Sequence, residues 1–110
     1  MISTHVLDTA LGAPARALAV RLEVLEGEGA WRTLARAITN DDGRVHGLAE
    51  PAPLAGRTCR LCFDVGAYLA SSGRPVFFPS VEITFVVGRD ASYHVPLLLS
   101  PFGYSTYRGS

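Results

Sequence analysis

The chain has 110 residues, a length that suits one domain spanning residues 1–110 and leaves no room for a second module beside a catalytic one. It is 48% hydrophobic but only 18% charged, which argues against disorder and makes oligomerisation plausible because few ionised side chains cover the surface. Its 10 basic residues balance its 10 acidic residues, so the chain offers no basic surface for a nucleic acid. All 10 basic residues are arginine, and the lack of lysine excludes Schiff-base chemistry on a lysine and a P-loop lysine.

Apolar residues alternate with polar ones in several segments, the pattern of half-buried strands. In residues 18–24 the even-numbered apolar side chains share one face, while Arg21 and Glu23 share the other. The only helical signal lies at 66–73, where Gly73 would end the helix. Pro96 places the strand that contains it at a sheet edge or a bulge. Six or more short strands favour an antiparallel β-sandwich. The predicted strands are 18–24, about 31–38, 59–65, 81–87 and a strand from near 93 through 99.

Two cysteines, Cys59 and Cys62, form a Cys-x-x-Cys within one of these predicted strands. Residues three apart on a strand point to opposite faces, and no second pair is present to complete a zinc site. We therefore expect two reduced thiols in the core or at an interface. The first residues lack the pattern of a signal peptide, and no apolar segment could cross a bilayer, so we expect a soluble, cytoplasmic protein without membrane contact.

Three histidines are the candidate acid–base groups: His5, His46 and His94. A lone histidine is more often structural than catalytic, and no two lie at the spacing of a local metal motif. His5 beside Val6 and His94 beside Val95 would each face away from the core on a strand that buries the valine. Arg44 follows the turn glycine Gly43, where it would face either a ligand or solvent.

The last ten residues are unusual for a chain end, because they carry three aromatic side chains. We expect this end to be docked on the protein, at least as the cover of a sheet edge.

Five separated motifs resemble the 5-hydroxyisourate hydrolases, the transthyretin-like protein family, and together they span essentially the whole chain. The terminal Tyr-Arg-Gly-Ser is the most specific, because the related thyroid-hormone carriers share the fold without it. The motifs are Ser3–Thr9 with Gly12–Ala15, Thr39–Arg44, Phe77–Pro79, Tyr93–Pro101 and Tyr107–Ser110.

This resemblance implies an all-β, transthyretin-like sandwich of about eight strands with one short helix. It implies a homotetramer with sites at the dimer–dimer interface, and hydrolysis of 5-hydroxyisourate to 2-oxo-4-hydroxy-4-carboxy-5-ureidoimidazoline in urate catabolism. It also implies that no metal or other cofactor is needed. The implied catalytic residues are His5, Arg44, His94 and Ser110, and the implied substrate-binding residues are His5, Arg44, Tyr107 and Arg108.

Within that site, histidines near neutral pKa suit proton transfer, and a planar, permanently charged Arg44 suits a carbonyl-rich anion. His5 and His94 would move protons, one of them activating water that Ser110 helps to orient, while Arg44 and Tyr107 hold the substrate. Which histidine is the base stays open. The sequence departs from the family pattern at Ser92, where a histidine is frequent, and at Phe102, where a tyrosine is common.

Two other functions remain to be distinguished. A non-catalytic carrier of an aromatic small molecule would use the same fold, but would not need the terminal tetrapeptide. A metal site would require the three histidines to converge in space.

Overall fold

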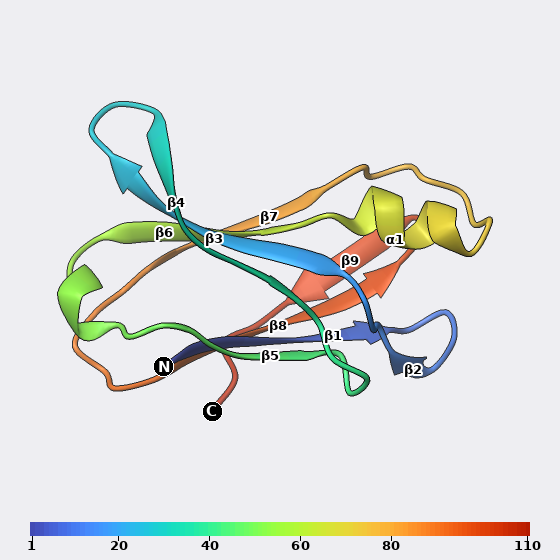
Figure 1. Ribbon diagram of the computed structural model, residues 1–110, viewed down its shortest axis with the longest axis horizontal. Coiled ribbons are helices and arrows are strands. Elements are labelled where there is room, and N and C mark those ends of the chain that lie inside the picture. Colours follow the sequence, from blue (N-terminus) through green and yellow to red (C-terminus); the bar gives the residue numbers. More distant parts are fainter.

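The computed structural model describes residues 1–110 and consists of two β-sheets packed face to face (Figure 1). One sheet has the order β2-β1-β8-β9, with β5 also paired to β1, and the other has the order β4-β3-β6-β7. The elements are β1 (Ile2–Asp8), β2 (Ala13–Pro14), β3 (Ala19–Glu26), β4 (Ala30–Ile38), β5 (Arg44–Ala49), the 3-10 helix η1 (Ala52–Leu54), β6 (Thr58–Phe63), α1 (Val65–Ser71), β7 (Val81–Val86), β8 (Tyr93–Ser100) and β9 (Gly103–Thr106).

The predicted sandwich is confirmed, and its core follows the period-two pattern. Val20, Leu22 and Val24 of β3 are buried between the sheets, and Arg21 lies on the outer face. In β1 the inward residues alternate with partly exposed ones, which leaves Ser3 and His5 on the outer face of the first sheet.

Two details differ from the prediction. All strand pairs are antiparallel except β1 with β8, which run parallel. Pro96 was predicted at a sheet edge or a bulge, but β8 is an inner strand between β1 and β9 and its register with β1 is unbroken at Pro96, so neither position is found. The regular β8–β9 ladder instead stops at Leu97 paired with Thr106, next to the residue that has no N–H to donate.

The short helix α1 is confirmed, shifted by one or two residues. The predicted strand 59–65 ends at Phe63, because the side chain of Asp64 accepts a hydrogen bond from the Ala67 N–H and begins the helix there. The chain leaves the helix at Gly73, whose φ of 69° favours glycine. No helix of the structure is long and apolar enough to span a bilayer.

Candidate active site

The outer face of the first sheet collects the polar side chains of three strands. Along β1, His5 is paired with Arg44 of β5, and Ser3 is paired with His94 of β8. Paired residues on neighbouring strands point to the same face, so segments that are up to 91 residues apart place their side chains together. The three strands lie side by side in Figure 1.

The turn before β5 fixes Arg44 relative to His5. The side-chain oxygen of Asn40 accepts hydrogen bonds from the Asp42 and Arg44 N–H groups, at 2.9 and 3.0 Å. Gly43 has φ of 74°, and a Cβ at this position would collide with the carbonyl oxygen of Val6. This close approach explains why the turn needs glycine.

His5 itself is held by the same turn. Its Nε2 lies 2.8 Å from the carbonyl oxygen of Asp42, and a carbonyl only accepts, so Nε2 carries the proton and donates it. In neutral His5, Nδ1 is therefore the free ring nitrogen.

A hollow of about 260 Å³ opens beside these residues, with the chain's first and last residues at its wall. Of the predicted catalytic residues, Arg44, His94 and Ser110 line it, and His5 stands next to it as the ladder partner of Arg44. His46, a candidate acid–base group that was not among the predicted site residues, also lines the hollow, and so do Ser3 and Met1, which were not predicted there. The alternation of Ser3 with His5 and of Arg44 with His46 puts each pair on one face. The full lining is Met1, Ser3, Thr4, Arg44, His46, Ser92, His94, Gly109 and Ser110.

His94 is the most specialised group of the hollow. Its Nδ1 lies 2.9 Å from Oγ of Ser3. Partial burial lowers the pKa of His94 below its ordinary value of 6.5, and electrostatic interactions with Arg44, His5 and His46 lower it further. His94 is therefore neutral at pH 7, with a fixed ring and one nitrogen free of protein partners.

The chain terminus reaches the hollow by pairing with β8. The Gly109 N–H donates to the carbonyl oxygen of His94 at 2.8 Å, which brings Ser110 to the wall. Tyr107 is 58% exposed and lies outside the lining residues. The guanidinium of Arg108 is also outside, because it pairs with Asp90 at 2.8 Å.

The histidines do not form a metal centre with one another, since no group of three or more His, Cys, Asp or Glu side chains in the structure could hold an ion.

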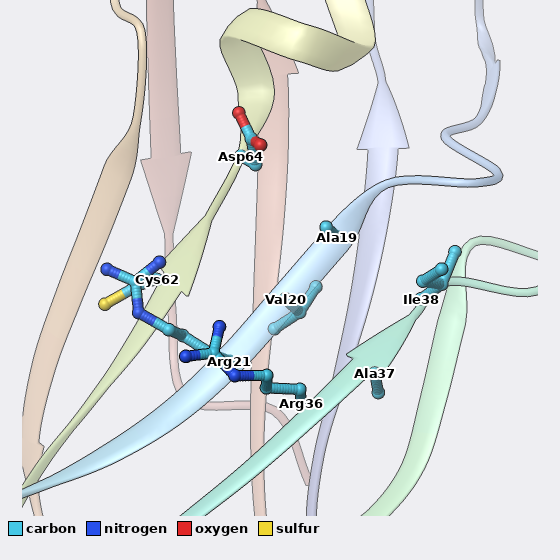
Figure 2. Close-up of a pocket in the computed structure, with 8 residues that line it drawn as sticks. All are labelled: Ala19, Val20, Arg21, Arg36, Ala37, Ile38, Cys62 and Asp64. Carbon is cyan, nitrogen blue, oxygen red and sulfur yellow. The ribbon is translucent and has the colours of Figure 1, made fainter. Parts of the chain in front are cut away.

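A second hollow, on the outer face of the other sheet, lacks such chemistry (Figure 2). Arg21 and Cys62 come to it from β3 and β6, together with Ala19, Val20, Arg36, Ala37, Ile38 and Asp64. Burial, with a further contribution from Glu23, raises the pKa of the Cys62 thiol to about 11, so it stays protonated and unreactive. Cys59 is buried in the core, and both cysteines are free thiols on opposite faces of β6, as predicted.

Fold and site together define a transthyretin-like β-sandwich with a polar histidine–arginine hollow on one sheet. The family model "HIUase/Transthyretin family" matches residues 2–109. The chain belongs to this family.

Individual relatives match this chain over nearly its full length. The chain is 51% identical to "5-hydroxyisourate hydrolase 2" of Rhizobium meliloti over 116 residues, which cover 99% of this chain and 95% of the relative. The solved 5-hydroxyisourate hydrolase of Klebsiella pneumoniae is 40% identical with a TM-score of 0.84, covering 99% of this chain and 98% of the other. Sea bream transthyretin, solved in complex with thyroxine, has a TM-score of 0.91 at 28% identity, covering 98% and 93%. The backbone of this chain is thus similar both to a transthyretin and to a 5-hydroxyisourate hydrolase, while the sequence identity is higher to the hydrolases.

Proposed function

We propose that this protein hydrolyses 5-hydroxyisourate in urate catabolism. The observation that carries the proposal is the meeting of neutral His94, Arg44 and the terminal Ser110 in one hollow, on a chain 51% identical to a 5-hydroxyisourate hydrolase. A carrier does not need these groups in one hollow.

Hydrolysis begins with activation of water by His94. In the tautomer that carries its proton on Nδ1, this nitrogen donates to Oγ of Ser3, and Nε2 is free to accept a proton from water. The resulting hydroxide attacks a ring amide carbonyl of the substrate, and the hydroxyl of Ser110 orients the attacking water.

Arg44 holds the substrate and stabilises the negative charge that develops on the carbonyl oxygen. The C–N bond then breaks, and the departing ring nitrogen takes the proton that His94 accepted. His5, held by Asp42 beside Arg44, assists proton transfer and contacts the substrate, and Tyr107 helps to hold the substrate. The net reaction adds one water across one amide bond and needs no metal or other cofactor.

The proposal also includes the assembly. We infer that the domain of residues 1–110 forms a homotetramer whose subunits cover the open hollows. Exposed aromatic residues near β9 support this inference, because a monomer gains nothing from exposing them: Phe77, Phe102, Tyr104 and Tyr107 are 45% to 69% exposed. A cytoplasmic location belongs to the same proposal, since both cysteines are free thiols, as is usual in reducing compartments.

The test follows the ultraviolet absorbance of freshly generated 5-hydroxyisourate. We expect rapid loss with the wild type, and a rate lower by about 100-fold or more in His94→Gln and Arg44→Ala, the usual scale for removing a proton-transfer or charge-stabilising group. Arg36→Ala, on the outer face of the other sheet, is the matched control and should keep wild-type turnover.

If the wild type hydrolyses 5-hydroxyisourate no faster than the uncatalysed background and binds thyroxine at micromolar concentration, the proposed hydrolase function is wrong and the carrier function is supported. Sedimentation should give a mass near four chains, and a monomer at micromolar concentration would overturn the tetramer.

A further inference from the structure

The last four residues are held by few hydrogen bonds. In the β8–β9 ladder Leu97 pairs with Thr106. His94, three residues earlier in β8, pairs with Gly109, three residues later in the chain, so the antiparallel register is unchanged. Between these pairs Pro96 offers no N–H, and its carbonyl oxygen is taken by Oγ1 of Thr106 at 2.7 Å. The Gly109 N–H is the only backbone group of residues 107–110 with a backbone hydrogen bond.

Arg108 supplies the second attachment of this tail. Side chains alternate along an extended chain, so Arg108 points away from the face that Gly109 presents to His94. One of its terminal nitrogens (Nη2) lies 2.8 Å from Oδ2 of Asp90, and its guanidinium carbon lies 4.7 Å above the ring centre of Tyr93.

Tyr93 joins both parts of this attachment. Its ring is buried, and its hydroxyl oxygen accepts hydrogen bonds from the Gly88 and Asp90 N–H groups at 2.7 and 3.1 Å. The same side chain therefore lies under the Arg108 guanidinium and fixes the loop that carries Asp90.

The fit at the other end of the tail is tight. A Cβ on Gly109 would lie 2.5 Å from Cδ2 of the His94 ring. The tail thus lies flush against His94, and a small displacement of residues 108–110 moves Ser110 relative to that ring.

We propose that Asp90 and Tyr93 are positioning residues that hold Arg108, and thereby keep Gly109 and Ser110 seated against His94. Arg108 acts as the latch of the tail instead of a substrate contact. The consequence for turnover rests on the proposed function, whereas the latch itself is a statement about tail docking.

The latch is weak and depends on charge. Asp90 and Arg108 are more than half exposed, and an exposed ion pair changes an equilibrium by about 1.5-fold to fivefold and is screened by salt. The tail therefore opens locally without unfolding of the sandwich, which makes the exchange of the Gly109 amide hydrogen the direct readout of its docking.

The experiment compares Gly109 amide exchange by NMR in the full-length wild type, Asp90→Asn and Glu28→Gln. Glu28 is an exposed residue of the β3–β4 turn, so its variant removes the same charge far from the tail. We expect exchange to be about twofold to fivefold faster in Asp90→Asn and unchanged in Glu28→Gln. Raising the salt concentration should accelerate exchange in the wild type and have little effect in Asp90→Asn. Equal exchange in Asp90→Asn and the wild type would overturn the latch, whether or not the protein hydrolyses 5-hydroxyisourate.

A charge exchange distinguishes the latch from a substrate contact. Asp90→Arg and Arg108→Glu should each speed Gly109 exchange and lower kcat/KM, and the double variant should be closer to wild type than either single variant in both readouts. Additive losses in kcat/KM in the double variant would identify Arg108 as a substrate-binding group and overturn its assignment as a latch.

Discussion

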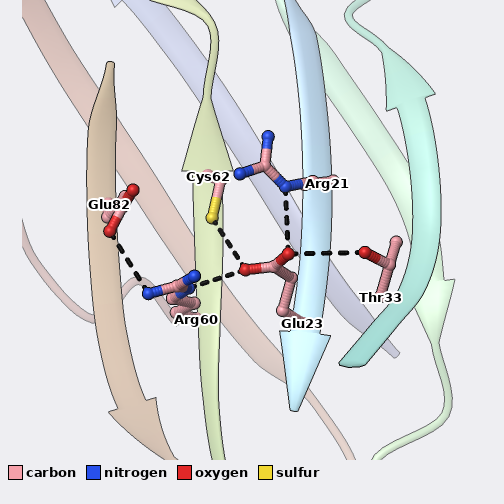
Figure 3. A network of polar contacts seen from close by, with 6 residues as sticks. All are labelled: Arg21, Glu23, Thr33, Arg60, Cys62 and Glu82. Carbon is pink, nitrogen blue, oxygen red and sulfur yellow. Dashed lines mark hydrogen bonds and ion pairs between the residues drawn. The ribbon is translucent and has the colours of Figure 1, made fainter. Parts of the chain in front are cut away.

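Glu23 offers a sharp test of how the second sheet is stabilised. Glu23 lies on the outer face and is 7% exposed, and its carboxylate accepts hydrogen bonds from Nε of Arg60 at 2.6 Å and Nε of Arg21 at 3.1 Å (Figure 3). Thr33 and Cys62 donate to it from the two neighbouring strands. The perturbation is Glu23→Gln, which keeps the shape of the side chain and removes its charge.

The size of the effect follows from the pKa of Glu23. Burial alone would raise this pKa, but the hydrogen bonds from Arg60, Arg21 and Cys62 outweigh burial and lower it from 4.5 to about 2. Ionised Glu23 then contributes about 3 kcal/mol to the free energy of unfolding at pH 7. Because the pKa is lowered in the folded state, the contribution is complete above pH 4.5 and declines as the pH falls toward 2, with about 1.5 kcal/mol left at pH 3.

Urea unfolding at a fixed protomer concentration measures this, because the midpoint of an oligomer depends on concentration. We expect Glu23→Gln to be less stable than the wild type by about 3 kcal/mol at pH 7 and by about half as much at pH 3. Glu26→Gln is the control: Glu26 also pairs with arginines but is exposed, so its deficit should be clearly smaller. A Glu23→Gln deficit of the same size at both pH values would refute the electrostatic account.

Three further predictions concern the site. Gly43→Ala should lower the free energy of unfolding by at least about 2 kcal/mol in urea titrations, since the added Cβ meets the carbonyl oxygen of Val6 at a positive φ, and it should reduce kcat/KM by displacing Arg44. The acid limb of the pH profile of kcat/KM should have its midpoint below 6.5, because the lowered pKa of His94 keeps the base neutral to lower pH; a midpoint above 6.5 would exclude His94 as that base. Ser3→Ala should lower kcat about fivefold, the effect of losing one orienting hydrogen bond of about 1 kcal/mol, with the folded state retained by circular dichroism.

The strands were predictable because one face of each packs into a core, which forces the period-two pattern. Their neighbours were not, since periodicity says which face a residue takes but not which strand lies beside it. Ser3 shows the consequence: its hydroxyl lies against His94, 91 residues away, and only the β1–β8 pairing brings the two together. The parallel direction of that pair, and the inner position of β8, were hidden for the same reason.

Arg108 shows a different limit. The family resemblance grouped it with Tyr107 and Ser110, so it was expected in the site as a substrate-binding residue. Along an extended chain, however, neighbours point to opposite faces, and the Arg108 guanidinium is paired with Asp90 and lies outside the residues that line the hollow. Strand alternation alone predicts that Arg108 points to the opposite face from Tyr107 and Gly109, provided that the tail is treated as an extended strand.

Pro96 links this geometry to the chemistry of the site. A tail paired residue by residue with β8 would be an ordinary edge strand, held along its whole length. Because Pro96 has no N–H, the ladder stops after Thr106 and resumes only at Gly109. The tail is thus attached through the Gly109 N–H and the Arg108 side chain, and Tyr107 between the ladder and these attachments stays exposed. A chain end built this way keeps the register of the sheet and still places its last hydroxyl beside His94.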